Sequence, residues 1–162
     1  LKTSPDTYIK VTYKEINPIE SKNVIYPVSQ KVYNTLFLSS DIEPTKKSTK
    51  WYEINNNNKK MQYKIVGPKY IQVRTRAIID STKENYQFNI YEDGYKKGEH
   101  LYQSSSPKNE VYILDDDNNK IQLTKQDYLN INVPAGTHYY SFKKSKKSSK
   151  MYVKVESYSR IK

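Results

Sequence analysis

Two arginines on one face of a predicted strand are the residues best suited to hold a charged ligand. Arg74 and Arg76 stand two positions apart in the segment 69–80. Successive side chains of a strand point to opposite faces, so both guanidinium groups share a face. Such groups bind carboxylates, phosphates and acidic sugars through paired hydrogen bonds. The pair predicts an anion-binding face; the alternatives are a solvated sheet face or cross-strand ion pairs with Glu156 or Glu53.

Amide and phenol side chains are expected to complete this ligand surface. Tyrosine can stack on sugar rings and form hydrogen bonds with their hydroxyl groups. Most of the seventeen tyrosines are expected to pack in the core or across strands. The predicted ligand-binding residues are Arg74, Arg76, Asn89, Tyr91 and Tyr152.

A lysine-rich segment near the C-terminus is a second candidate surface. Residues 143–150 could contact acidic polysaccharide, lipopolysaccharide or anionic lipid. The alternative, which the pattern favours, is a solvated hairpin loop that keeps the protein in solution. The predicted polyanion contacts are Lys143, Lys144, Lys146, Lys147 and Lys150.

Metal-binding and catalytic patterns are weak. The acidic segment 115–119 begins with an EF-hand-like spacing, but Lys120 and Gln126 stand where that loop needs glycine and glutamate. His100 and His138 are the only histidines, and neither has zinc-ligand spacing or a nearby serine elbow. No strand carries the paired carboxylates expected of a jelly-roll glycosidase. We therefore expect no metal, no cofactor and no catalytic residues, with His138 as a structural hydrogen-bonding residue.

The elements that would position these residues are strands. Ile71, Val73, Thr75 and Ala77 alternate with polar residues, which indicates a strand buried on one side. Similar runs recur with turn residues between them, including Gly67-Pro68, Asp93-Gly94 and 134–136, and helical periodicity is poor. The predicted strands lie at 7–16, 23–28, 31–39, 51–54, 62–66, 69–80, 86–91, 99–104, 111–114, 120–123, 129–133, 137–143 and 151–158.

This pattern predicts an all-β fold, an antiparallel, jelly-roll-like β-sandwich with an N-terminal extension that adds strands. We expect residues 1–50 to form that extension, with two or three strands packing on the main domain. Residues 51–162 are expected to form the sandwich itself. A chain of 162 residues is long enough to bury a stable core without disulfide bonds or bound metal ions.

Composition restricts the function classes. The formal net charge is +11 at pH 7, but only three of the 28 basic residues are arginines. Abundant lysine, asparagine, isoleucine and tyrosine indicate an AT-rich bacterial genome, and this composition argues against nucleic acid binding. No apolar run is long enough for a membrane span. The start at Leu1 predicts a mature chain that has been exported to the periplasm, to the outer membrane as a lipoprotein, or outside the cell. Peripheral or lipid-anchored attachment to a membrane is a further alternative.

Two segments resemble jelly-roll carbohydrate-binding modules of the galactose-binding-like type. Residues 129–142 are similar to the closing hairpin of those modules, and residues 88–94 resemble their middle strand, which ends in an Asp-Gly turn. The resemblance covers residues 51–158. It implies an eight-stranded jelly roll and sugar binding, and the first fifty residues have no counterpart in it.

Together these patterns predict a non-catalytic binding module of the cell envelope or extracellular space. It would recognise acidic glycan or an envelope protein, and it is not expected to be an enzyme. The alternative is a structural or assembly subunit that acts through protein–protein contacts. A glycan-active enzyme is the third hypothesis.

Overall fold

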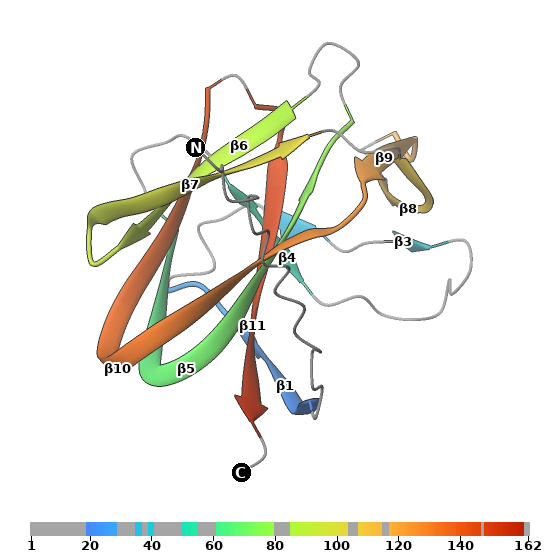
Figure 1. Ribbon diagram of the computed structural model, residues 1–162. Coiled ribbons are helices and arrows are strands. Elements are labelled where there is room, and N and C mark those ends of the chain that lie inside the picture. Colours follow the sequence, from blue (N-terminus) through green and yellow to red (C-terminus); the bar gives the residue numbers. More distant parts are fainter. Residues whose placement is uncertain are drawn as a thin grey trace, which may run out of the picture.

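All regular secondary structure in the part of the chain that the computed structural model describes is β-strand (Figure 1). The described residues are 19–28, 35–36, 39–40, 50–54, 61–79, 85–103, 107–114, 117–146 and 148–160. They contain no helix that could cross a membrane. The strands are β1 (Ile19–Ile25), β2 (Thr35–Leu36), β3 (Ser39–Ser40), β4 (Trp51–Ile54), β5 (Met61–Ala77), β6 (Asn85–Glu92), β7 (Tyr95–Gln103), β8 (Pro107–Leu114), β9 (Lys120–Thr124), β10 (Asp127–Lys144) and β11 (Met151–Arg160).

One large antiparallel sheet has the order β2-β4-β11-β5-β10-β6-β7, with β1 also paired to β11. A small sheet has the order β3-β8-β9. The prediction of an all-β antiparallel sandwich is confirmed. The strand predicted at 7–16 lies outside the described residues, and the proposed division at residue 50 stays a prediction.

The two longest strands bend sharply and run through both layers of the sandwich (Figure 1). Residues 61–67 of β5 pair with 136–142 of β10, and residues 69–75 pair with 127–133. Strands β6 and β7 extend the first of these ladders, whereas β11 extends the second. The large sheet thus folds over on itself, and each half forms one layer.

The turns expected at Gly67-Pro68 and at 134–136 are corrected by this arrangement. Both segments are bends within continuous strands, and Gly67 pairs with Gly136 across a register shift in the ladder. Positive φ (+113°) at Gly136 and the absence of a side chain at Gly67 allow the two backbones to bend together. The Asp93-Gly94 hairpin turn is confirmed, with φ angles of 51° and 88°.

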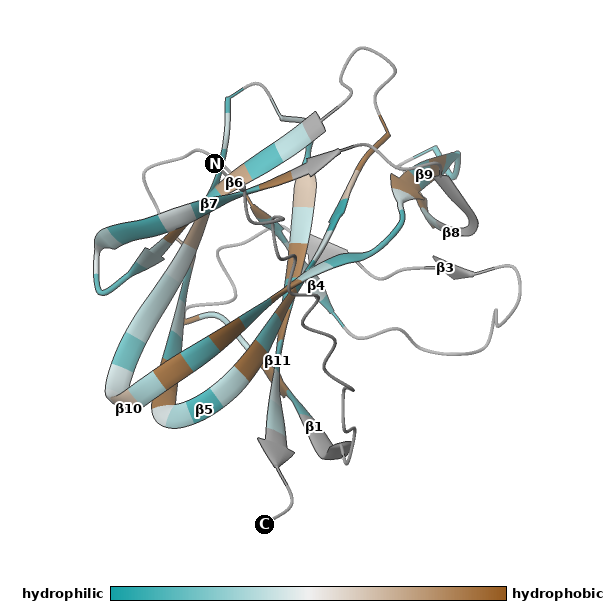
Figure 2. Ribbon diagram, viewed as in Figure 1, coloured by the Kyte–Doolittle hydropathy of each residue, from teal (hydrophilic) through white to brown (hydrophobic). Residues whose placement is uncertain are grey.

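The main core lies between the two layers, because alternate residues of each long strand are apolar (Figure 2). Ile71 and Val73 from one layer are fully buried, as are Tyr63 and Phe88 from the other. Ile131 packs partly buried against this core. A second cluster forms on the outer face of the β11 layer, where the β8–β9 pair covers the large sheet; it contains Trp51, Ile113, Leu123 and Tyr152.

Substitution of Gly67 tests whether the two bends must approach this closely. A Cβ atom at Gly67 would lie 1.7 Å from the carbonyl oxygen of Pro134. We expect Gly67→Ala to lower the free energy of unfolding by about 3 kcal/mol, because backbone must move to accept the methyl group. Urea denaturation measures the loss.

Gly98→Ala is the matched control, since a Cβ there meets no atom within 4 Å. An equal stability of the two variants would contradict the close packing of the bends.

Candidate functional site: a pocket between the layers

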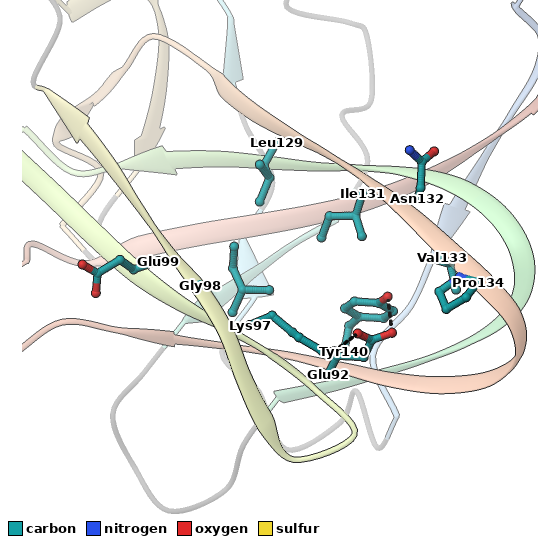
Figure 3. A pocket seen from close by; sticks show the side chains of 11 residues that line it. Glu92, Lys97, Gly98, Glu99, Leu129, Ile131, Asn132, Val133, Pro134 and Tyr140 are labelled. Carbon is teal, nitrogen blue, oxygen red and sulfur yellow. Dashed lines mark hydrogen bonds and ion pairs between the residues drawn. The ribbon is translucent and has the colours of Figure 1, made fainter.

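A pocket opens on the side of the sandwich where the β6–β7 hairpin faces the first part of β10 (Figure 3). Its volume is about 600 Å³, within the range of roughly 300–1,000 Å³ usual for small-molecule sites. In the described part of the chain, residues 127–133 of β10 pair with β5 alone, so β6 does not continue over them. The two layers therefore separate along this side.

Apolar side chains form most of the pocket wall. Among its polar residues, Lys97 and Glu99 are exposed at the rim, whereas Glu92 and Tyr140 are largely buried. Ile90 comes from β6, and Leu129, Ile131, Val133 and Pro134 come from β10. The polar lining residues are Glu92, Lys97, Glu99, Asn132 and Tyr140. This combination suits a ligand with an apolar face and hydroxyl groups at its edges.

Glu92 is the best-defined polar group of the pocket. Its Oε1 accepts a hydrogen bond of 2.8 Å from the Tyr140 hydroxyl, and its Oε2 lies 3.1 Å from Lys97 Nζ. These contacts, the tyrosine first, hold the pKa of Glu92 below its usual value despite partial burial. Burial and the same hydrogen bond raise the pKa of Tyr140. Glu92 is therefore an ionised carboxylate at the pocket wall.

A charge cluster around His138 joins Glu92 to the neighbouring turn. His138 Nδ1 lies 2.9 Å from Asp93 Oδ2 and 3.3 Å from Glu92 Oε1. Asp93 Oδ1 also accepts a hydrogen bond of 2.9 Å from the Tyr139 amide. Ligand atoms of Glu92, Asp93 and His138 lie within 4.8 Å of one another, close enough for a metal ion, but the imidazole and Lys97 already pair with the two carboxylates. We interpret the group as a hydrogen-bonded charge cluster.

The pKa shifts in this cluster define a pH window of stabilisation. The hydrogen bonds from the Tyr139 amide and from His138 hold the pKa of Asp93 below its usual value, and Asp93 raises the pKa of His138. The contribution of His138 to the free energy of unfolding is present below its unfolded pKa of about 6.5 and is lost as pH rises through its folded pKa. The carboxylate contributions are present above about pH 4 and are lost as pH falls.

The predicted arginine site is engaged internally. Arg74 Nε lies 2.6 Å from Glu156 Oε2, and the guanidinium also donates a hydrogen bond to Tyr158. Arg76 is buried beneath the small sheet and donates to the Thr124 carbonyl oxygen at 2.7 Å. The cross-strand pair with Glu156 is one of the alternatives that the sequence leaves open.

Of the remaining predicted ligand residues, Tyr152 alone lies beside one of these arginines, as the cross-strand partner of Arg76. Tyr152 is buried beside Trp51 on the outer face of the β11 layer, and burial raises its pKa to about 12. Asn89 and Tyr91 alternate with the core residues Phe88 and Ile90, so they belong to the outer face of the β6 layer. The predicted set is thus divided between two opposite faces, and its role in binding stays a prediction.

The lysine-rich segment is partly structured. Lys144 Nζ donates to the Ser148 carbonyl oxygen at 2.8 Å, and the buried Ser148 bonds through its hydroxyl to the backbone of Gln87. Lys143, Lys146 and Lys150 are exposed, and Lys147 lies outside the described residues. Their contact with a polyanion stays a prediction.

No protein-family model and no curated protein matches the sequence. Among solved structures, the chain is similar to the catalytic domain of GH87 alpha-1,3-glucanase in complex with nigerose, with a TM-score of 0.45 and 12% identity over 87% of this chain and 28% of that chain. It is also similar to the Agl-KA catalytic domain, with a TM-score of 0.42 and 14% identity over 92% of this chain and 30% of that chain.

These matches correct the function predicted from the sequence. The matched chains are catalytic domains, which contradicts the expected non-catalytic envelope module for acidic glycan or a partner protein. The resemblance to carbohydrate-binding modules is not confirmed by them. This chain spans less than a third of either matched chain, and no activity or site is transferred from them. The absence of catalytic activity and the export of the chain stay predictions.

Sequence reasoning missed Glu92 as a site residue, although it identified the neighbouring Asp93-Gly94 turn and the hydrogen-bonding role of His138. Segments 92–99 and 129–140 each carry a local signal, since charged or titratable residues lie near a glycine, Gly94 in the first and Gly136 in the second. Nothing in their separate patterns shows that 92–99 and 129–140 face each other, because that contact depends on the bend of β10.

Removal of the tyrosine hydroxyl tests the electrostatics of the pocket. We expect Tyr140→Phe to raise the pKa of Glu92 toward 4.5, because the strongest contact that stabilises the carboxylate is lost. Carbon-detected NMR titration of the Glu92 carboxyl group measures the shift. An unchanged pKa would show that Tyr140 does not hold Glu92 ionised.

Glu156 tests whether the arginine site is structural. Its side chain is 2% exposed and contacts both Arg74 and Lys154, at 2.6 and 3.0 Å. We expect Glu156→Gln to cost about 3 kcal/mol in the free energy of unfolding, because two cations lose their counterion. Glu99→Gln, which breaks the exposed Lys96–Glu99 pair, is the control and should cost less than about 1 kcal/mol. If Glu156→Gln left the free energy of unfolding unchanged, Arg74 would be available to a ligand.

Proposed function

We propose that the pocket between the layers binds a neutral saccharide unit and that the chain is a glycan-handling domain. The observation that carries this proposal is the composition of the pocket wall. The C–H face of a sugar ring can pack on apolar side chains such as Leu129 and Ile131, while the Glu92 carboxylate can accept hydrogen bonds from its hydroxyl groups.

Charge favours a neutral ligand over an acidic one. Lys97, the cationic side chain among the residues that line the pocket, is already paired with Glu92 at 3.1 Å. Glu92 itself is held ionised and would repel a second carboxylate. An ionised carboxylate is, however, a strong acceptor for sugar hydroxyl groups.

The pocket carboxylates support binding more directly than hydrolysis. Glycosidases place two carboxyl groups on either side of the scissile bond. Glu92 faces Tyr140 inside the pocket, whereas Glu99 points away from that pair (Figure 3). The two residues therefore do not face each other across a bound sugar.

A binding screen with paired variants tests this function. Isothermal titration with neutral gluco-, galacto- and manno-oligosaccharides should identify a ligand whose affinity falls roughly tenfold in Glu92→Gln, the usual cost of losing a charge-assisted hydrogen bond. Glu99→Gln makes the same chemical change on the rim and should leave the affinity near that of the native chain.

Equal effects of the two variants, or no binding by any oligosaccharide, would overturn the proposal. Release of reducing ends in the same mixtures tests the separate prediction that the chain has no catalytic activity.

A further inference from the structure

His138 contacts hydrogen-bond acceptors through both of its ring nitrogens. Nδ1 lies 2.9 Å from a carboxylate oxygen of Asp93, and Nε2 lies 3.3 Å from the carbonyl oxygen of Ala135. A neutral imidazole carries a proton on one nitrogen only, whereas the imidazolium donates from both. The surroundings of this ring therefore match the protonated form.

The two acceptors belong to different segments, and each is adjacent in sequence to a residue that lines the pocket. Asp93 lies in the turn between β6 and β7, and Ala135 lies in the bend of β10. The backbones of Asp93 and Tyr139 are joined by a hydrogen bond of 2.9 Å. The residues adjacent to these acceptors, Glu92 and Pro134, line the pocket. A bond through the ring thus connects the two segments that carry pocket residues.

The charged groups around the ring fix the sign of its response to pH. Glu92 and Asp93 face it from β6 and the turn, and Lys97 of β7 reaches it through Glu92. On its own strand Tyr140 donates to Glu92, and on β5 its register partner is the apolar Ile65. The groups in direct contact are acceptors or anions, so they favour the imidazolium.

We propose that His138 is a positioning residue whose protonated ring ties the β6–β7 turn to the bend of β10 and fixes Glu92 for saccharide binding. The inference rests on the proposed function of the pocket. When the ring loses its proton, the Nε2 bond to Ala135 or the Nδ1 bond to Asp93 is lost, and the bonds between Asp93 and Tyr139 alone hold the turn to this part of β10 less firmly. Saccharide affinity then falls as pH rises.

The first measurement does not need a ligand. Nitrogen-detected NMR of the histidine rings should show both His138 nitrogens protonated at pH 5.5 and still protonated above the usual histidine pKa of about 6.5. Amide exchange, corrected for the intrinsic effect of pH, should show faster opening at Asp93 and Tyr139 at pH 8 than at pH 5.5. A neutral ring at pH 5.5, or equal opening at both values, would overturn the inference.

The second measurement follows a saccharide identified by the oligosaccharide screen. Its affinity should fall by roughly 5-fold or more between pH 5.5 and 8, the lower end of usual coupling between sites. His138→Gln should bind weakly at both pH values and lose the pH dependence. Asp93→Asn keeps an acceptor for the Tyr139 amide but removes the negative charge beside the ring. The loss of affinity should therefore shift to lower pH.

His100→Gln is the matched control, because His100 bonds to Asp127 and is not among the pocket residues. It should keep the native pH profile. A native profile in His138→Gln would overturn the positioning role. If no oligosaccharide bound, but the His138 ring was protonated and amide opening at Asp93 and Tyr139 depended on pH, the saccharide function would be ruled out. The link that His138 makes between the turn and the bend would still stand.

Discussion

The contact between the bend of β5 at Gly67 and the bend of β10 at Pro134 determines how the sandwich forms. Two strands of this length would make one extended, twisted sheet if they ran straight. Because their backbones meet closely where a side chain is missing, both strands bend at the same place and remain paired on either side. One ladder therefore supplies the inner strands of both layers, and the core fills the space between its two halves.

The same constraint produces the pocket. Strand β6 pairs with only the last part of β10, so in the described residues the β6–β7 hairpin faces the first part of β10 without backbone pairing to it. A sandwich whose layers were joined by separate hairpins would place these edges independently. Here a change in the bend alters the distance between Glu92 and the apolar wall of β10. The site is thus as rigid as the contact that sets the angle between the layers.

Two-residue periodicity was sufficient to predict which faces are buried. Val73 is fully buried, and Glu92 lies between the correctly predicted strand 86–91 and the correctly predicted turn at 93–94, because alternation and turn chemistry are local properties. Gly67-Pro68 and 134–136 were predicted as turns because the same residue types favour chain reversals and strand bends. Only the pairing of one bend with the other, 69 positions apart in the register Gly136↔Gly67, distinguishes the two outcomes. Burial of Arg76 was missed for a related reason, since its cover comes from the distant β8–β9 pair.

Two charge clusters in the described residues differ in their access to solvent. In the Arg74–Glu156–Lys154 cluster the carboxylate is 2% exposed and lies between two cations, so solvent hardly reaches it. In the Glu92–Asp93–His138 cluster the ring is 18% exposed and Asp93 is exposed, so solvent can exchange the proton. Histidine is the side chain that titrates near neutral pH. The His138 ring contacts Asp93 in the β6–β7 turn and Ala135 in the bend of β10, so a change in its charge acts on two segments that carry pocket residues.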